Sequence, residues 1–160
     1  MRVKAIKDED FVNYKVPCMF ISTCFCDWKC CHEAGIPEDV CQNNALAEMK
    51  LIDISADNIY RRYINNPISE AVVIGGLEPI KQFDEMYELI KTFRSNGCND
   101  YFVIYTGYNK VEISNFINKL CDFNNIIIKF GRFIPNQEPH YDSVLCVKLI
   151  SDNQYAEVIC

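Results

Sequence analysis

Six of the ten cysteines in this chain of 160 residues lie between Cys18 and Cys41. All of these except Cys18 follow an apolar run, Val16 to Ile21, that is typical of a buried strand. Thiolates bind zinc, copper(I) and iron–sulfur clusters, so dense thiols after a strand indicate a soft-metal site. Cys26 and Cys30 form a C-x3-C pair, and ten residues separate Cys30 from Cys41. Three cysteines suit a 4Fe–4S cluster in which one iron lacks a protein ligand and can bind a substrate.

A structural zinc site is the main alternative for these thiols. Zinc usually takes four ligands, and Cys31, Cys24 or His32 is close enough in sequence to supply the fourth. Cys31 or Cys24 could also replace one of the three proposed cluster ligands. The other five cysteines are predicted to be small hydrophobic residues or surface thiols, namely Cys18, Cys98, Cys121, Cys146 and Cys160.

Composition and charge narrow the class of protein. The net charge of −6 argues against nucleic acid as the main partner, which would require a basic surface. No apolar run approaches the roughly 18 residues that span a bilayer, and the charged segment Met1 to Asp10 lacks the apolar core of a signal peptide. We therefore expect a cytoplasmic protein without a membrane partner, in which disulfides are not expected. The length predicts a single domain over residues 1–160.

The remaining elements predict an α/β fold. Apolar strands at 71–74, 101–105 and 126–130 alternate with amphipathic helices at 83–94 and 110–120. This alternation indicates a mainly parallel sheet, and the strands are too few to close a full barrel, so we expect an open partial barrel. Each unusual motif follows a strand, and the carboxyl ends of parallel strands carry the sites of α/β proteins. A helix starting at Ser55 and a hairpin between 144–150 and 155–159 are also expected.

The cysteine spacing resembles that of the radical S-adenosylmethionine (SAM) enzymes, and most closely that of the activating proteins of anaerobic ribonucleotide reductase. Their signature is C-x3-C-x2-C, with a hydrophobic residue before the third cysteine and, in this branch, an Asn two residues after it. By this resemblance Cys26, Cys30 and Cys41 are the cluster ligands, flanked by Val40 and Asn43 as cofactor-binding residues. The second gap contains ten residues here instead of two, as if eight had been inserted.

Further motifs extend the resemblance to the end of the chain. The run G-G-L-E-P at 75–79 resembles S-G-G-E-P, whose main chain and Glu hold the methionine amino group of SAM, which implies SAM-binding roles for Gly75, Gly76 and Glu78. Y-T-G-Y at 105–108 contains Thr106, a further candidate for cofactor binding. G-R-F-I at 131–134 and S-D-N-Q at 151–154 match motifs of the same subfamily. Glu78 can also be understood as a helix cap beside Pro79.

The resemblance implies a specific activity. A reduced 4Fe–4S cluster would bind SAM, cleave it to methionine and a 5′-deoxyadenosyl radical, and so generate a glycyl radical on the anaerobic ribonucleotide reductase. No catalytic side chain is expected beyond the cluster and SAM, and a flavodoxin-like protein is the expected electron donor. Two alternatives remain: a radical SAM enzyme that acts on another protein or peptide, and a non-catalytic zinc or iron–sulfur interaction module.

Overall fold

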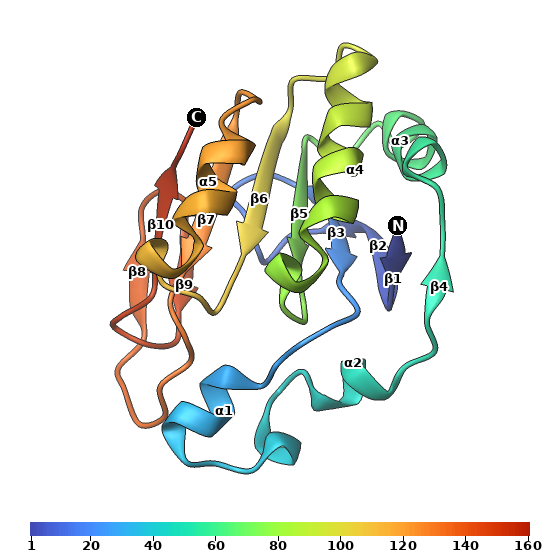
Figure 1. Ribbon diagram of the computed structural model, residues 1–160. Helices are drawn as coiled ribbons and strands as arrows, with labels where there is room; N and C mark the ends of the chain where they lie inside the picture. The colour runs from blue at the N-terminus through green and yellow to red at the C-terminus, as the bar shows by residue number, and fades with distance from the viewer.

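A six-stranded sheet forms the centre of the computed structural model, which describes residues 1–160 (Figure 1). Strands β3, β5, β6 and β7 run parallel, and the edge strands β2 and β10 are antiparallel to their neighbours. The sheet is not closed, so the predicted open, mainly parallel α/β architecture is confirmed. In order across the sheet, the strands are β2 (Ala5–Asp10), β3 (Cys18–Ser22), β5 (Ala71–Gly75), β6 (Tyr101–Tyr105), β7 (Ile126–Phe130) and β10 (Tyr155–Val158).

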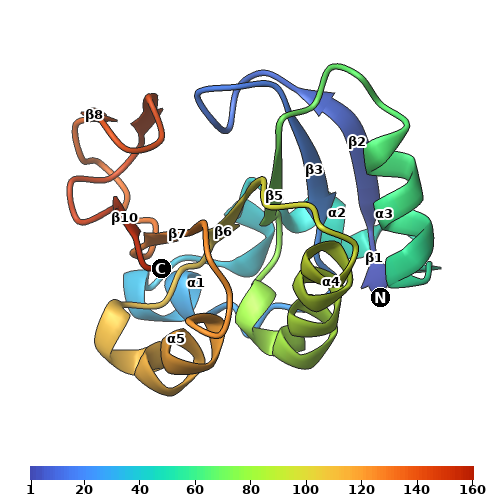
Figure 2. The same ribbon diagram turned by 90° about the horizontal axis from the view of Figure 1, so that it is seen from above.

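Helices cover one face of the sheet, as the view from above shows (Figure 2). Side chains that alternate along the strands, such as Ile74 and Ile104, belong to the same core as Leu89 of the covering helices. Ser55 caps the first of these helices as predicted, because its hydroxyl accepts a hydrogen bond from the Asn58 backbone. The helical segments are α3 (Ala56–Ile64), η2 (Pro79–Gln82), α4 (Phe83–Ser95), η3 (Lys110–Ile113) and α5 (Ser114–Leu120).

The opposite face of the sheet carries a smaller core that no helix covers. Val73, Val103 and Ile127 point to this side and pack with Tyr14 and Leu145, which lie in two connecting segments. One segment precedes β3, and the other contains the hairpin of β8 (His140–Asp142) and β9 (Val147–Leu149). Figure 2 shows both segments on the side of the sheet away from α4 and α5.

Two predictions about the later elements were wrong. The expected hairpin between 144–150 and 155–159 does not form, since β9 pairs with β8 and β10 pairs with β7. Both segments alternate as strands do, but alternation does not identify the partner strand. The helix expected from Lys110 begins as the 3-10 segment η3, which leaves Val111 exposed instead of on the apolar face.

The prediction for two of the cysteines was also wrong, because Cys121 and Cys160 form a disulfide. The backbone of Ile126 exchanges hydrogen bonds with Ile159 and Cys160, which holds the last residues beside the start of β7. Cys121 follows α5 just before that strand, so the two Cα atoms are 5.4 Å apart, within the range that a disulfide requires. The disulfide can form because the end of the chain pairs with the start of β7. The spacing of the cysteines in the sequence does not reveal that pairing.

The cysteine-rich segment crosses the carboxyl ends of the parallel strands, below the arrowheads in Figure 1. It contains three short elements, and two further short strands pair beside it. These are α1 (Lys29–Ala34), η1 (Glu38–Val40), α2 (Asn44–Glu48), and the pair β1 (Arg2–Val3) and β4 (Ile52–Asp53). None of the helices has the length and apolar character needed to span a bilayer.

Candidate 4Fe–4S and SAM site

The three proposed cluster ligands lie in the segment that crosses the strand ends. Cys26 precedes α1, Cys30 lies within it, and Cys41 follows η1. Burial raises the pKa of Cys26 to about 11, and a thiolate at Cys30 contributes to the rise. Burial and then a thiolate at Cys41 likewise raise the pKa of Cys30. Cys30 is thus close enough to Cys26 and to Cys41 for the charges of their thiolates to interact. The three ligands of one shared cluster would also lie this close together.

The arrangement of these thiols can be compared with what a cluster requires. No three side chains of His, Cys, Asp or Glu gather closely enough to hold a single metal ion. A 4Fe–4S cluster places a different demand on its ligands, because each cysteine binds a different iron and the sulfur atoms lie around separate corners of a cube. The thiols of Cys26, Cys30 and Cys41 lie near one another without converging on a single point, and this arrangement suits a cluster better than a single metal ion.

The two substitute ligands considered from the sequence occupy different surroundings. Cys31 is buried, and burial followed by thiolates at Cys30 and Cys41 raises its pKa to about 12. Cys24 is also buried, and burial raises its pKa, but the charges that act on it belong to Lys4, Glu85 and Arg2 and not to the proposed ligands. Of the two, Cys31 is the neighbour of the proposed ligands. A third candidate, His32, is exposed and pairs with a glutamate of η1.

The glycines of G-G-L-E-P allow a close backbone approach after β5. Gly76 has φ of +82°, and a Cβ atom there would lie 2.7 Å from Leu46 Cδ2 in α2. Leu77, which stands where the family has a second glycine, is not among the residues with positive φ, so the leucine adds no backbone strain. Asn43 Nδ2 donates a hydrogen bond of 2.6 Å to the Gly76 carbonyl. This bond ties the segment after Cys41 to the G-G-L-E-P turn.

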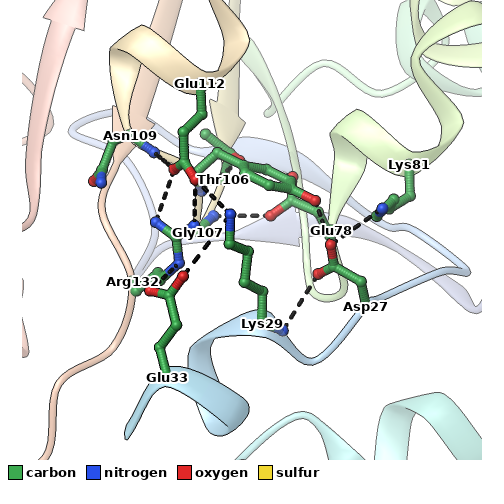
Figure 3. Close-up of polar contacts among 11 residues, drawn as sticks. Asp27, Lys29, Glu33, Glu78, Lys81, Thr106, Gly107, Asn109, Glu112 and Arg132 are labelled. Carbon is green, nitrogen blue, oxygen red and sulfur yellow. Dashed lines mark hydrogen bonds and ion pairs between the residues drawn. The ribbon is translucent and has the colours of Figure 1, made fainter.

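Glu78 is buried beside Thr106 and accepts hydrogen bonds through both of its carboxylate oxygens. Its Oε1 accepts from Thr106 Oγ1 at 2.7 Å, and its Oε2 accepts from the Gly107 backbone at 2.9 Å (Figure 3). Its Oε1 also accepts from the Ile80 backbone at 3.1 Å. Burial raises the pKa of Glu78, and these three donors oppose that effect. Because all three partners are donors, they suit the ionised carboxylate. Glu78 therefore caps η2, as one interpretation proposed, and also joins the ends of β5 and β6.

The other proposed cofactor-binding residues differ in their placement. Gly75 ends β5, and a Cβ atom there would lie 3.1 Å from Tyr105 Cβ, so this position favours glycine. Thr106 is buried between Glu78 and β7. Val40 lies in η1, and its side chain is exposed, so it contributes nothing to the core.

A buried lysine in β7 that was not predicted as a site residue lies close enough to Glu78 and Cys30 for their charges to interact. Lys129 is 7% exposed, and its Nζ donates one hydrogen bond, of 2.9 Å, to the Gly131 carbonyl. Burial lowers the pKa of Lys129 to about 8, whereas the negative charges of Glu78 and Cys30 oppose this change. A lysine inside the otherwise apolar run I-I-I-K-F was the signal that could have revealed it.

Ion pairs fasten the cysteine segment to the strand ends (Figure 3). Glu112, in η3, accepts hydrogen bonds from Arg132 Nη1 at 2.8 Å and Nη2 at 2.6 Å, and from Lys29 Nζ at 2.6 Å. Arg132 Nε also lies 2.9 Å from Glu33 Oε2, oriented as an ion pair without a hydrogen bond. A separate ion pair of 3.1 Å joins Asp27, just before α1, to a lysine of η2.

Two hollows adjoin Cys30. The larger, of about 390 Å³, lies between α1 and the segment after β7, with Glu33 and Phe133 among its lining residues. The smaller, of about 20 Å³, lies between the cysteines and the strand ends, and Glu78 is among its lining residues. Cys30 and Arg132 line both hollows. A ligand held at Glu78 could therefore extend past Cys30 into the larger cavity.

The open, mainly parallel sheet with a thiol-rich segment across its strand ends, together with a match to a cluster-binding family, defines a radical SAM-like domain that binds a 4Fe–4S cluster. Residues 15–154 match the family described as 4Fe–4S single cluster domain, and the chain belongs to that family. A search of curated proteins found no match. Membership of this family supports the binding of a single 4Fe–4S cluster.

Proposed function

We propose that this protein is a radical SAM activase that binds one 4Fe–4S cluster through Cys26, Cys30 and Cys41. Membership of the cluster-binding family and the grouping of these thiols at the strand ends support the proposal. The proposed substrate of the cluster is SAM. The observation that carries this assignment is the presence of two buried side chains of opposite charge, Glu78 and Lys129, which make no direct ion pair and lie close enough to each other and to Cys30 for their charges to interact.

The pair is suited to the amino acid end of SAM. Thr106 joins its two members, because its hydroxyl donates to Glu78 and its backbone N–H donates to the Lys129 carbonyl at 2.9 Å. An ammonium group has three donors, and Lys129 uses one of them, so it can bind a carboxylate. Glu78 and the main chain of Gly76 would face the α-amino group. A zwitterion matches this arrangement better than a ligand with one charge, because both buried side chains gain a partner.

The larger cavity fits the nucleoside end of the same molecule. Its volume of about 390 Å³ lies in the range of small-molecule pockets, and Cys30 connects it with the smaller hollow. When bound and reduced, the cluster would supply the electron that cleaves SAM. The roles of the protein are to orient the amino acid end with Glu78 and Lys129 and to exclude water with the buried strand ends.

The proposed target is a glycine of the anaerobic ribonucleotide reductase, with a flavodoxin-like protein as electron donor. The matches at 105–108 and 131–134 to motifs of the reductase activators support this choice. Activity on another protein or peptide is the alternative within the same chemistry. The feature that motivates this alternative is the gap between Cys30 and Cys41, which is longer than in the reductase activators. It folds as part of α1 and as η1.

The deciding experiment is anaerobic reconstitution with iron and sulfide, followed by electron paramagnetic resonance (EPR) of the reduced protein with and without SAM. We expect a 4Fe–4S signal that changes when SAM is added. Serine variants of Cys26, Cys30 and Cys41 should each lose most of the bound iron. Cys146→Ser is the matched control, since Cys146 is an exposed free thiol in the turn between β8 and β9.

The outcomes separate the candidate functions. A signal that responds to SAM, with an organic radical appearing on the reductase upon mixing, supports the activase. A response to SAM without a radical on the reductase points to another polypeptide target. If the thiols bind zinc and no cluster is retained, the enzyme proposal is wrong and an interaction module remains. If Cys31→Ser loses as much iron as Cys30→Ser, the assignment of Cys30 over its neighbour is wrong.

A further inference from the structure

Tyr108, at the end of Y-T-G-Y, contacts two of the three residues that separate Cys26 from Cys30. Its hydroxyl donates a hydrogen bond to Asp27 Oδ2, and Lys29 Nζ lies 5.5 Å from the centre of its ring. The third residue between the two cysteines is Trp28. A single side chain from the end of β6 therefore holds both flanks of the turn that joins the two proposed ligands.

Arg132 strengthens this contact from the end of β7. Its guanidinium lies 5.6 Å from the centre of the Tyr108 ring, and it makes two hydrogen bonds to Glu112, which also accepts from Lys29. The Arg132 side chain is 8% exposed, so water and salt screen these contacts less than they screen surface pairs. The hydrogen bonds from Arg132 lower the pKa of Glu112, which keeps this carboxylate charged.

The turn between the cysteines requires such external support. Trp28 has φ of 55°, a left-handed conformation that is unfavourable for a residue with a side chain, and it provides no side-chain cap for α1. Helix α1 has six residues, fewer than an isolated helix needs to be stable in water. Its conformation must therefore be fixed by tertiary contacts, and Tyr108, Arg132 and Glu112 provide them.

We propose that Tyr108 is a positioning residue that, with Arg132, holds Asp27 and Lys29 and so fixes the relative placement of the thiols on either side of them. This inference rests on the proposed function, in which those two cysteines are cluster ligands. The effect of Tyr108 on the cluster passes through the residues that flank Trp28, which is why it is assigned a positioning role and not a catalytic one.

The test compares Tyr108→Phe with Tyr87→Phe. Tyr87 makes the same kind of bond, donating to Asp122 Oδ2 at 2.8 Å, but lies on α4. In the metal-free protein, hydrogen exchange at 29–36 should become about tenfold faster in Tyr108→Phe, because a hydrogen bond to a charged group is lost. Tyr87→Phe should leave this segment unchanged. Asp27→Asn provides a second variant that weakens the same bond without changing the tyrosine.

Spectroscopy of the reconstituted protein provides the readout that a general loss of stability would not produce. We expect Tyr108→Phe to retain iron but to show an altered EPR line shape and midpoint potential, with Tyr87→Phe indistinguishable from the unmodified protein. If the unmodified protein binds a cluster and Tyr108→Phe changes neither exchange nor line shape, the positioning role is wrong while the proposed function stands. If the unmodified protein binds no cluster, the proposed function fails, and the role toward ligands fails with it.

Discussion

Replacing Lys129 with methionine should stabilise the metal-free protein while weakening its binding of SAM. Burial lowers the pKa of Lys129 from 10.5 to about 8, so the folded state holds the charged form at a cost. At about 1.36 kcal/mol for each pH unit, this difference amounts to about 3 kcal/mol. Methionine has a similar length and no charge, so the variant should gain about that amount in the free energy of unfolding at pH 7.

The pH dependence gives a second check with a defined sign. Below the folded pKa of about 8 both states are charged and the cost is present in full, whereas above 10.5 both are neutral and the cost is absent. The advantage of Lys129→Met should therefore shrink as the pH rises from about 8 to 10.5. Because thiols titrate in the same range, the quantity to follow is the difference between the variant and the unmodified protein.

The assay is urea unfolding of the metal-free protein with Lys148→Met as the control. Lys148 is an exposed lysine of β9, and its replacement should change the free energy of unfolding by no more than about 0.5 kcal/mol. After reconstitution, Lys129→Met should bind SAM at least about tenfold more weakly, because a charge-assisted hydrogen bond is lost. A variant no more stable than the unmodified protein at pH 7 would refute the reasoning about the buried charge. If Lys129→Met binds SAM as tightly as the unmodified protein does, Lys129 does not contact SAM.

Two further predictions concern stability. The disulfide between Cys121 and Cys160, with a sequence separation of 39, should contribute about 4 kcal/mol by restricting the unfolded chain, so a reductant should lower the urea midpoint by roughly 2 M. A double alanine variant of these cysteines should not respond to the reductant, and an equal response would assign the effect to other thiols. Gly76→Ala should destabilise the protein more than Gly97→Ala, since both have positive φ but only the first meets Leu46. Equal losses in urea unfolding would show that α2 moves aside freely.

The central strands could be predicted from the sequence because their signals are local. Tyr101–Tyr105 and Ile126–Phe130 coincide with the predicted bounds, since both are rich in β-branched and aromatic residues, apart from Lys129, and are flanked by turn-forming residues. The placement of Glu78 and Thr106 at neighbouring strand ends also follows from the parallel order, because both motifs come directly after adjacent parallel strands.

The features that could not be predicted depend on contacts between distant segments. The pairing of β10 with β7 and the disulfide at Cys160 both depend on where the chain returns after the end of β7. The importance of Lys129 emerges only when Glu78 is seen beside it. The support that Tyr108 gives to the turn at Trp28 is of the same kind, because no local pattern relates a residue after β6 to the conformation of a turn before α1.

The small core on the uncovered face limits how another polypeptide can reach the cysteines. Tyr14 and Leu145 occupy that face, so a chain laid lengthwise over the sheet would collide with them. The remaining approach is end-on, past the mouth of the cavity beside Phe133. A tight bend at the tip of a protruding loop suits that route, whereas the middle of an extended strand does not. Whether a glycine of a target is accessible would then depend on how far its loop protrudes, and not only on the residue type.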